Sequence, residues 1–304
     1  MGTPEFAVSC LKALKDCNCL VDLVVTRPDS PKGRGRNINP PPVKQAAESL
    51  GLEIIQPDSV QTDEFYEIIL NRRPDILVVV AFGHILPRRI LEIPAFGAIN
   101  MHASLLPAYR GPAPIQWAII NGETETGVTS MLMDKGMDTG EILLSEKTPI
   151  KPDDTAGTLH HRLAVLAAKV LAKTINGFET GTIQPVSQNH ALASYAPMLK
   201  KSDGRIDWSK PAEFIERFIR GMTPWPGAYT FMGKRRLKIF KSRVCSQTEK
   251  RPPGMVIRSF DNELRVACGK DAICILELQE DSGKKMDIAS FLTGKSIGSG
   301  TLFT

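Results

Sequence analysis

The stretch DILVVVA, residues 75–81, is apolar at every position after its first. A short continuous apolar run that is rich in β-branched residues is typical of a strand buried on both faces of its sheet. A second short run, AINM at residues 98–101, is apolar except for Asn100 and is also predicted to form a strand. Burial on both faces requires helices on both sides of the sheet, so these two runs predict the centre of an α/β domain.

Strand and helix patterns alternate on both sides of these two runs. Such alternation is typical of a mostly parallel, doubly wound, Rossmann-like sheet, in which ligands bind outside the carboxyl ends of the strands. Further strands are predicted over residues 20–25, 52–56 and 127–134, and helices over residues 43–50, 63–71, 114–121 and 156–176, the last with an N-cap at Asp154-Thr155 and an end at Gly177.

The beginning of the chain departs from this pattern. A doubly wound sheet usually opens with a strand, a turn and a helix. Here GTPEF at residues 2–6 has the composition of the turn, and AVSCLKAL at residues 7–14 has the pattern of the helix. Only Met1 precedes them, so the first strand is missing from this sequence. We therefore expect the natural protein to have residues upstream of Met1.

The last third of the chain has a different organisation. Residues 183–210 are polar and irregular and are predicted to form a linker, and residues 211–221 have the pattern of a short amphipathic helix. About five short strands separated by turn residues follow, which is typical of a small β-barrel such as the OB-fold. We expect a catalytic domain over residues 1–182 and an OB-fold-like domain over residues 211–304.

Composition and charge narrow the class of protein. No run of 18 apolar residues is present, and the six cysteines form no C-x-x-C pair, which favours reduced thiols in the cytoplasm. Residues 201–304 hold 19 Lys and Arg against 12 Asp and Glu. This excess indicates a polyanionic partner such as a nucleic acid, although a lysine-rich surface would have the same composition.

Three polar residues are predicted to lie together at the sheet edge. Asn100 and His102 point to one face because side chains alternate along a strand, and Asp138 lies in a glycine-flanked loop after the next strand. An Asn amide can donate to an oxyanion, a His can move a proton or stabilise negative charge, and an Asp can orient that His. No paired Ser or Cys nucleophile is evident, which favours direct acyl transfer. The alternative is that His102 only makes structural hydrogen bonds at the end of a strand and that Asp138 is an unrelated loop residue. The other histidines, at positions 84, 160, 161 and 190, are expected to be loop, surface or structural residues.

The residues around these three resemble the hallmark of the folate-dependent formyltransferases. The resemblance rests on NMHASLLP at 100–107, YRG at 109–111 and GMDTG at 136–140, and it covers nearly the whole chain. It continues through GTPEF at 2–6, PDILVVVAFG at 74–83, GVT at 127–129, RIDW at 205–208 and WPG at 225–227. Within the family, the chain looks most like the members that formylate methionyl initiator tRNA.

The resemblance implies a reaction and a co-substrate. The formyl group of 10-formyltetrahydrofolate would pass to the α-amino group of methionyl initiator tRNA, for translation initiation. Asn100 and His102 would stabilise the oxyanion, and Asp138 would hold and polarise His102. No metal is needed, and the sequence has no cluster of metal ligands. We expect a monomer. The residues expected to bind the folate are Phe82, Gly83, Ile85, Leu86, Ser104, Leu105, Leu106, Pro107, Gly136 and Met137.

Two basic segments are expected to bind tRNA. Lys32, Arg34 and Arg36 alternate with glycines in a loop, where backbone can approach phosphates closely. The resemblance assigns Arg34 as the key arginine of a loop that contacts the tRNA acceptor end. Arg236 and Lys238 share one face of a predicted strand in the C-terminal domain. A solvated basic loop and a charge-protected edge strand are the plainer interpretations.

Three alternatives remain open from the sequence. A formyltransferase that acts on an amino-sugar nucleotide would share the fold, the three polar residues and the folate. A glycinamide ribonucleotide formyltransferase would lack such a C-terminal barrel domain. A tRNA-binding relative without activity would be expected to lack one of the three polar residues. The basic loop and the positive C-terminal domain favour tRNA as the acceptor.

Overall fold

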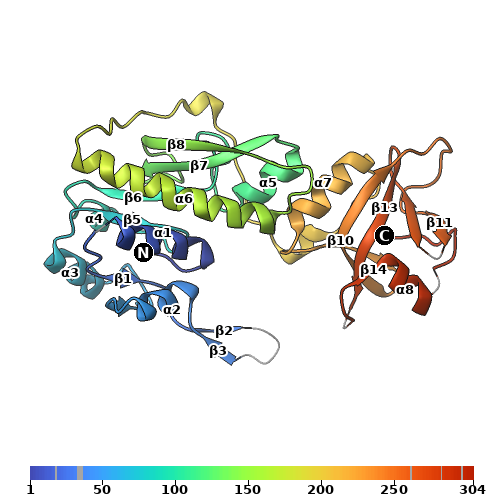
Figure 1. Ribbon diagram of the computed structural model, residues 1–304, viewed down its shortest axis with the longest axis horizontal. Coiled ribbons are helices and arrows are strands. Elements are labelled where there is room, and N and C mark those ends of the chain that lie inside the picture. The colour runs from blue at the N-terminus through green and yellow to red at the C-terminus, as the bar shows by residue number, and fades with distance from the viewer. Residues whose placement is uncertain (18, 33–36, 261, 282, 296) are drawn as a thin grey trace. The chain divides into compact units, whose positions relative to one another are not determined.

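Figure 1 shows the computed structural model of the chain, which describes residues 1–17, 19–32, 37–260, 262–281, 283–295 and 297–304. The chain forms two compact units. The first comprises Met1–Pro114, Glu125–Pro149 and His160–Ala196, and the second comprises Ile115–Thr124, Ile150–Leu159 and Pro197–Thr304. Residues 183–196, predicted as part of a linker, thus belong to the first unit.

The first unit contains the predicted α/β sheet. Strand β5 (Leu77–Val79) pairs in parallel with β6 (Ala98–His102), and β1 (Val24–Val25) pairs in parallel with β4 (Ile54–Ile55). Beyond β6, the sheet continues antiparallel through β7 (Glu125–Leu132) and β8 (Ile142–Pro149). The two parallel pairs follow the sequence prediction. The reversed direction of β7 was not predicted, since an apolar run gives no information on strand direction. A separate hairpin pairs β2 (Ser30–Lys32) with β3 (Asn37–Asn39).

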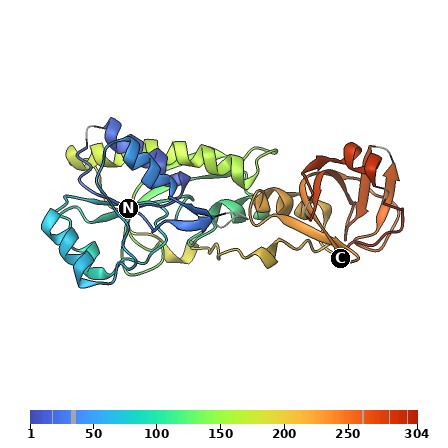
Figure 2. The same cartoon turned by 90° about the horizontal axis from the view of Figure 1, so that it is seen from below.

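Helices lie on both sides of these strands, as a doubly wound fold requires. Figure 2 shows α3 (cyan) and α6 (yellow-green) on opposite sides of the sheet. The hydroxyl of Thr62 accepts the N–H of Phe65 and caps α3. Helix α6 continues through Gly177, where we expected it to end. The helices of this part of the chain are α1 (Glu5–Asp16), α2 (Pro42–Ser49), α3 (Asp63–Arg72), α4 (Arg88–Leu91) and α6 (Ala156–Glu179).

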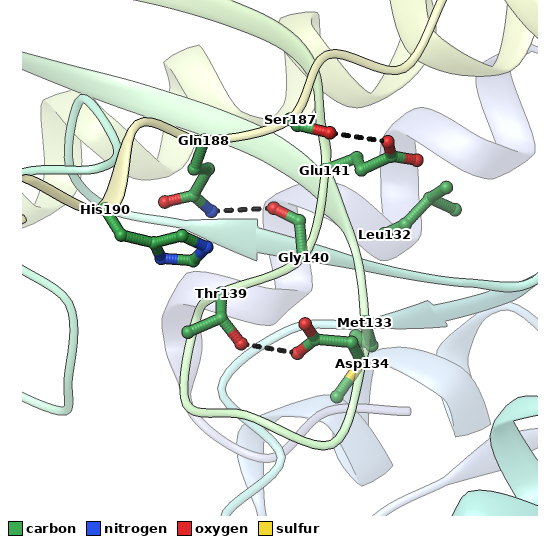
Figure 3. Close-up of a pocket in the computed structure, with 9 residues that line it drawn as sticks. All are labelled: Leu132, Met133, Asp134, Thr139, Gly140, Glu141, Ser187, Gln188 and His190. Carbon is green, nitrogen blue, oxygen red and sulfur yellow. Dashed lines mark hydrogen bonds between the residues drawn. The ribbon is translucent and has the colours of Figure 1, made fainter.

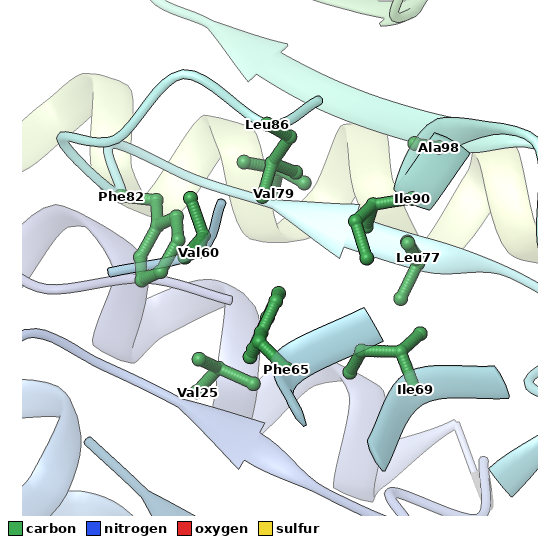
Figure 4. Packing of buried hydrophobic residues seen from close by; sticks show 10 residues of the cluster. All are labelled: Val25, Val60, Phe65, Ile69, Leu77, Val79, Phe82, Leu86, Ile90 and Ala98. Atoms are coloured by element: carbon green, nitrogen blue, oxygen red, sulfur yellow. The ribbon is translucent and has the colours of Figure 1, made fainter. Parts of the chain in front are cut away.

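One face of β1 and β5 packs against α3 and α4 in a closed apolar cluster (Figure 4). Phe65 and Ile69 of α3 contribute the helix side, and Ile90 of α4 is fully buried among them. Burying one such side chain stabilises the fold by about 1.5–3 kcal/mol. The cluster consists of Val25, Val60, Phe65, Ile69, Leu77, Val79, Phe82, Leu86, Ile90 and Ala98.

Met1 and Gly2 lie between β1 and β5, in the position of a central strand. The N–H of Gly2 donates to the carbonyl of Val25 at 3.0 Å, and the N–H of Val80 donates to the carbonyl of Met1 at 2.9 Å. The Met1 amine donates to the carbonyl of Val78 at 2.7 Å, and burial lowers its pKa from 8.0 to about 5. A cavity of about 550 Å³ adjoins these two residues, and its lining includes residues 19–25 and 72–78. We call this cavity the strand slot.

The second unit contains an antiparallel sheet with the strand order β11-β12-β13-β10-β9. The C-terminal residues bridge both of its edges, since Phe303 pairs with Met232 of β9 and Leu302 pairs with Met255 beside β11. The sheet is thus curled, in agreement with the predicted β-barrel domain. Its elements are α7 (Ala212–Met222), β9 (Ala228–Met232), β10 (Arg235–Cys245), β11 (Val256–Phe260), β12 (Glu263–Ala267), β13 (Ala272–Glu280), β14 (Met286–Asp287) and α8 (Ile288–Gly294), together with most of α5 (Pro114–Asn121).

Helix α5 joins the second unit because it packs closely against α7. A Cβ on Gly221 of α7 would lie 2.5 Å from Cγ1 of Ile120, so only glycine allows this approach. The side chain of Arg217 also reaches the carbonyl of Ile120 at 3.4 Å. Two short 3-10 helices, His190–Leu192 and Lys201–Gly204, complete the described elements.

Candidate active site

Asn100 and His102 occupy alternate positions at the end of β6, and both side chains approach Asp138. Nδ2 of Asn100 donates to Oδ1 of Asp138 at 3.5 Å, and Nδ1 of His102 lies 3.6 Å from Oδ2. The antiparallel β7 ends opposite Ile99, at the other end of β6 from His102. Asp138 therefore reaches the two residues from a loop that folds back across the strands.

The backbone around Asp138 has an uncommon conformation. Asp138 has a φ angle of +54°, in the left-handed region, and the N–H of Gly111 donates to its Oδ2 at 2.7 Å. Two residues further on, a Cβ on Gly140 would lie 1.7 Å from the carbonyl oxygen of Leu132. The glycine-flanked pattern that the sequence shows here thus has a steric cause, because a side chain at Gly140 would displace the loop.

His102 is held by a hydrogen bond at one ring nitrogen. Its Nε2 lies 2.9 Å from the carbonyl oxygen of Tyr109, and the side chain is 7% exposed. A carbonyl oxygen only accepts hydrogen bonds, so Nε2 carries a hydrogen in this arrangement. Nδ1 then faces the carboxylate of Asp138. A proton can be exchanged at that nitrogen when the ring becomes charged.

The residues predicted to bind folate differ in their exposure. Phe82 and Leu86 are 2% and 6% exposed and belong to the apolar cluster described above. Ile85 and Met137 are 86% and 61% exposed, on loops that lead away from β5 and β7. Ile85 and Met137 therefore present their side chains at the surface, whereas the side chains of Phe82 and Leu86 pack in the core.

The segment after His102 is held by hydrogen bonds. Oγ of Ser104 donates to the carbonyl of Ala108 at 2.6 Å, and the N–H of Leu106 donates to the hydroxyl of Thr129 at 3.2 Å. Both Ser104 and Leu106 are buried, and Leu105 and Pro107 are half-buried. Gly83 has a φ angle of +83° in the loop after β5, and Gly136 lies within the loop of Asp138.

The predicted tRNA-binding residues fall into two groups. Arg34 and Arg36 lie outside the described residues, and for Lys32 the structure describes the backbone, at the end of β2. Arg236 and Lys238 lie on one face of β10, as predicted, opposite Phe231 and Tyr229 of β9.

Two buried residues beside this site were not predicted from the sequence. Arg110 is 2% exposed, and Gln188 is 7% exposed although it lies in the segment predicted as a linker. The amide of Gln188 donates to the carbonyl of Gly140, as Figure 3 shows, and it lines a pocket of about 320 Å³ with Thr139, Glu141 and His190. Arg110 belongs to the quoted YRG motif, whereas no local signal marks Gln188.

Two further properties concern the described part of the chain. Its helices include none long and apolar enough to cross a membrane. Its His, Cys, Asp and Glu side chains also form no group of three or more that could hold a metal ion.

The comparisons with known proteins agree with this fold. Residues 1–175 match the family model described as formyl transferase, and residues 198–296 match the formyl transferase C-terminal domain. The chain therefore belongs to the formyl transferase family, and it is a formyl-transferring enzyme.

The relatives within the family are more specific. A methionyl-tRNA formyltransferase of Trichlorobacter lovleyi is 50% identical over 302 residues, which are 99% of this chain and 95% of the relative. One from Caldanaerobacter subterraneus is 48% identical over 303 residues, 99% of this chain and 98% of the relative. Among solved structures, the sugar 3N-formyltransferase WlaRD, determined with dTDP and 5-N-formyl-THF, has a TM-score of 0.67 at 20% identity over 90% of this chain and 95% of its own. That likeness shows a shared fold.

Proposed function

We propose that the chain transfers the formyl group of 10-formyltetrahydrofolate to the α-amino group of methionyl initiator tRNA. The observation that carries this proposal is that Asn100, His102 and Asp138 converge at the end of β6. Full-length relatives at about half identity, which are named methionyl-tRNA formyltransferases, support the acceptor. The formyl-folate in the WlaRD structure supports the donor class. As expected from the sequence, we place the enzyme in the cytoplasm as a monomer.

In this reaction the methionyl amine attacks the formyl carbon and a tetrahedral intermediate forms. Nδ2 of Asn100 would donate to the oxyanion, where a preorganised donor stabilises developing charge, and His102, as an imidazolium with a second proton on Nδ1, would stabilise the same negative charge. Asp138 would hold His102 and take up the proton that the attacking amine loses, directly or through water. The intermediate then collapses, the bond from the formyl carbon to N10 breaks, and N10 leaves with the proton that Asp138 took up, so the carboxylate is restored.

The folate would bind beside β5 and β6, at the carboxyl edge of the parallel strands. Of the residues predicted to contact it, Ile85 and Met137 expose apolar side chains that a flat heterocycle could cover. The segment Ser104–Pro107 would contact the folate through the exposed parts of Leu105 and Pro107. Phe82 and Leu86 would shape the site from the core beneath it.

The tRNA would contact the basic loop, through Lys32, Arg34 and Arg36, and the second unit. There the guanidinium of Arg236 lies 3.9 Å from the ring centroid of Tyr229, whose ring packs edge to face on Phe231 at 5.7 Å. The guanidinium of Arg205 lies 5.8 Å from the ring centroid of Phe231. Cations interleaved with half-buried aromatic rings are typical of surfaces that bind nucleic acid. We call these four residues the barrel patch.

An amino-sugar nucleotide is the competing acceptor, because WlaRD has the same fold. One experiment separates the two functions. Purified protein is given 10-formyltetrahydrofolate with either methionyl initiator tRNA or a dTDP-amino-sugar, and formylated product is measured. The proposal predicts formyl-methionyl-tRNA alone, and formylation of the sugar alone would exclude it.

A further inference from the structure

A continuous set of hydrogen bonds joins Arg110 to the loop that carries Asp138. Nε and Nη2 of Arg110 donate to Oε1 of Gln188 at 3.2 and 2.6 Å. Nε2 of Gln188 donates to the carbonyls of Asp138 and Gly140 at 3.0 and 2.7 Å. Both side chains are buried, so these contacts are made away from bulk water.

The orientation of the Gln188 amide follows from its partners. A guanidinium only donates and a backbone carbonyl only accepts, so the amide oxygen must face Arg110 and the amide nitrogen must face the loop. The reversed amide would place donor against donor and acceptor against acceptor. Arg110 is fixed in turn, since its Nη2 lies 3.1 Å from Nδ1 of His190 and its backbone pairs with Ser194 and Ala196 at 2.8 and 2.7 Å.

The Asp138 loop needs such support. The left-handed conformation of Asp138 is uncommon for residues other than glycine; aspartate adopts it more readily than most residues, and the surrounding contacts keep the loop in it. The carboxylate is held by the N–H of Gly111, and the carbonyl of the same residue is held by Gln188. Two neighbours in sequence therefore fix Asp138. Gly111 binds its side-chain carboxylate, and Arg110 acts through Gln188 on its backbone carbonyl.

We propose that Gln188, oriented by Arg110, is a positioning residue that holds the backbone of Asp138 so that its carboxylate stays beside Asn100 and His102. This inference rests on the catalytic role proposed above for Asp138. Gln188 does not itself touch the reacting atoms. Its effect should therefore appear in the rate of formyl transfer and depend on the presence of the Asp138 carboxylate.

Two substitutions test the two halves of the amide. Gln188→Met removes all four hydrogen bonds at similar length, and Gln188→Glu keeps an acceptor for Arg110 but places an oxygen against the carbonyls of Asp138 and Gly140. We expect either change to lower the single-turnover rate of formyl transfer by about 10- to 100-fold, because small displacements of a catalytic group have effects of this size. The KM for each substrate should change less than about twofold.

A matched control comes from the adjacent residue. Ser187 donates from its hydroxyl to Glu141 at 3.0 Å, between the same two segments of chain. Ser187→Ala should leave the rate within about twofold of the unsubstituted protein. A loss equal to that of Gln188→Met would mean that any contact between these segments has the same effect, and it would overturn the proposal.

The decisive measurement is a double-mutant cycle with Asp138→Asn, since Asn tolerates the left-handed conformation. If Gln188 acts through the carboxylate, Gln188→Met should lower the rate less than about twofold in the Asp138→Asn background. An equal loss in both backgrounds, or no loss in either, would overturn the proposal. Unchanged activity of Asp138→Asn by itself would instead overturn the proposed role of Asp138, and the inference with it. Where Gln188→Met fails to fold, judged by its thermal melting, the cycle is run with Gln188→Glu.

Discussion

Nδ1 of His102 lies 3.6 Å from Oδ2 of Asp138, and the same oxygen accepts the backbone N–H of Gly111 at 2.7 Å. The carboxylate is thus held by one backbone donor while it faces the imidazole. This arrangement can orient His102 and still exchange a proton with it.

Replacing His102 should affect the rate far more than the binding of folate. His102→Ala removes the group that would move a proton and share the oxyanion, and such groups typically contribute about 10²–10⁴-fold to a rate. We expect kcat to fall at least about 100-fold, while the folate Kd changes less than about threefold. Stopped-flow formyl transfer and equilibrium folate binding measure the two quantities. A near-normal kcat would remove His102 from the mechanism.

A methyl group at Gly140 should disturb the active site more than one at a glycine with open space. Gly140→Ala places Cβ against the carbonyl of Leu132, so the loop of Asp138 must move. We expect at least about a tenfold lower kcat. The control is Gly294→Ala at the end of α8, where the added Cβ would meet no heavy atom within 4 Å outside its chain neighbours and the adjacent helix backbone. Equal activity of both variants would contradict the role of the loop.

Arg236 should contribute to tRNA affinity in a salt-dependent way. Removing one phosphate contact makes the plot of log binding constant against log salt concentration less steep by about 1. It also weakens the binding of all tRNAs alike. Arg236→Ala should show both effects in a filter-binding titration from low to high salt. The control is Arg251→Ala in the same unit, whose guanidinium pairs with Glu249 at 2.6 Å. An unchanged slope for Arg236→Ala would place tRNA elsewhere than on the barrel patch.

The Met1 amine should make stability depend on pH. Its pKa is about 5 in the folded 304-residue chain and 8.0 as an ordinary amine, because burial disfavours the charge. Between pH 5 and pH 8 the unfolded chain binds the proton and the folded chain does not, so the free energy of unfolding rises with pH over this window. The shift corresponds to at most about 4 kcal/mol, lost as the pH falls to 5.

Acetylating the Met1 amine isolates this contribution. The acetylated chain keeps one N–H for Val78 but has no charge, so the difference in unfolding free energy between the two chains should be constant above about pH 8 and should change toward pH 5. Chemical denaturation at several pH values measures it. A difference that does not change with pH would show that the amine is not buried.

The strand slot should accept an added strand. In β5, the N–H of Leu77 donates to the carbonyl of Gly97 beside β6, whereas the carbonyl of Val78 accepts from Met1 on the opposite side. Because backbone groups alternate between the two sides of a strand, those of Ile76 also face the slot. Joining four β-branched residues to the Met1 nitrogen should therefore raise the unfolding free energy by about 0.5–1.5 kcal/mol for each new hydrogen bond, whereas four Gly and Ser residues should add less. Equal stability of the two extended chains would contradict a strand-binding slot.

The sequence predicted those features that leave a local pattern. The run at 75–81 contains β5, the run at 98–101 covers β6 up to its last residue, and alternation along β6 placed Asn100 and His102 on one face. The direction of β7 has no local pattern of this kind. The burial of Phe82 and Leu86 in the cluster of α3 has none either, because an apolar residue after a strand can face either the core or a ligand. Gln188 could not be found because its partners Asp138 and Arg110 lie 50 and 78 residues away in the chain.

The formylation of methionyl initiator tRNA by the purified chain tests the central claim most directly. With 10-formyltetrahydrofolate as donor, the account predicts formyl-methionyl-tRNA at a rate that Asn100→Ala lowers by about 10²–10³-fold, as expected for the loss of one oxyanion donor. A protein that binds the folate and forms no formyl-methionyl-tRNA, or an Asn100→Ala variant that forms it at the unsubstituted rate, would contradict the account.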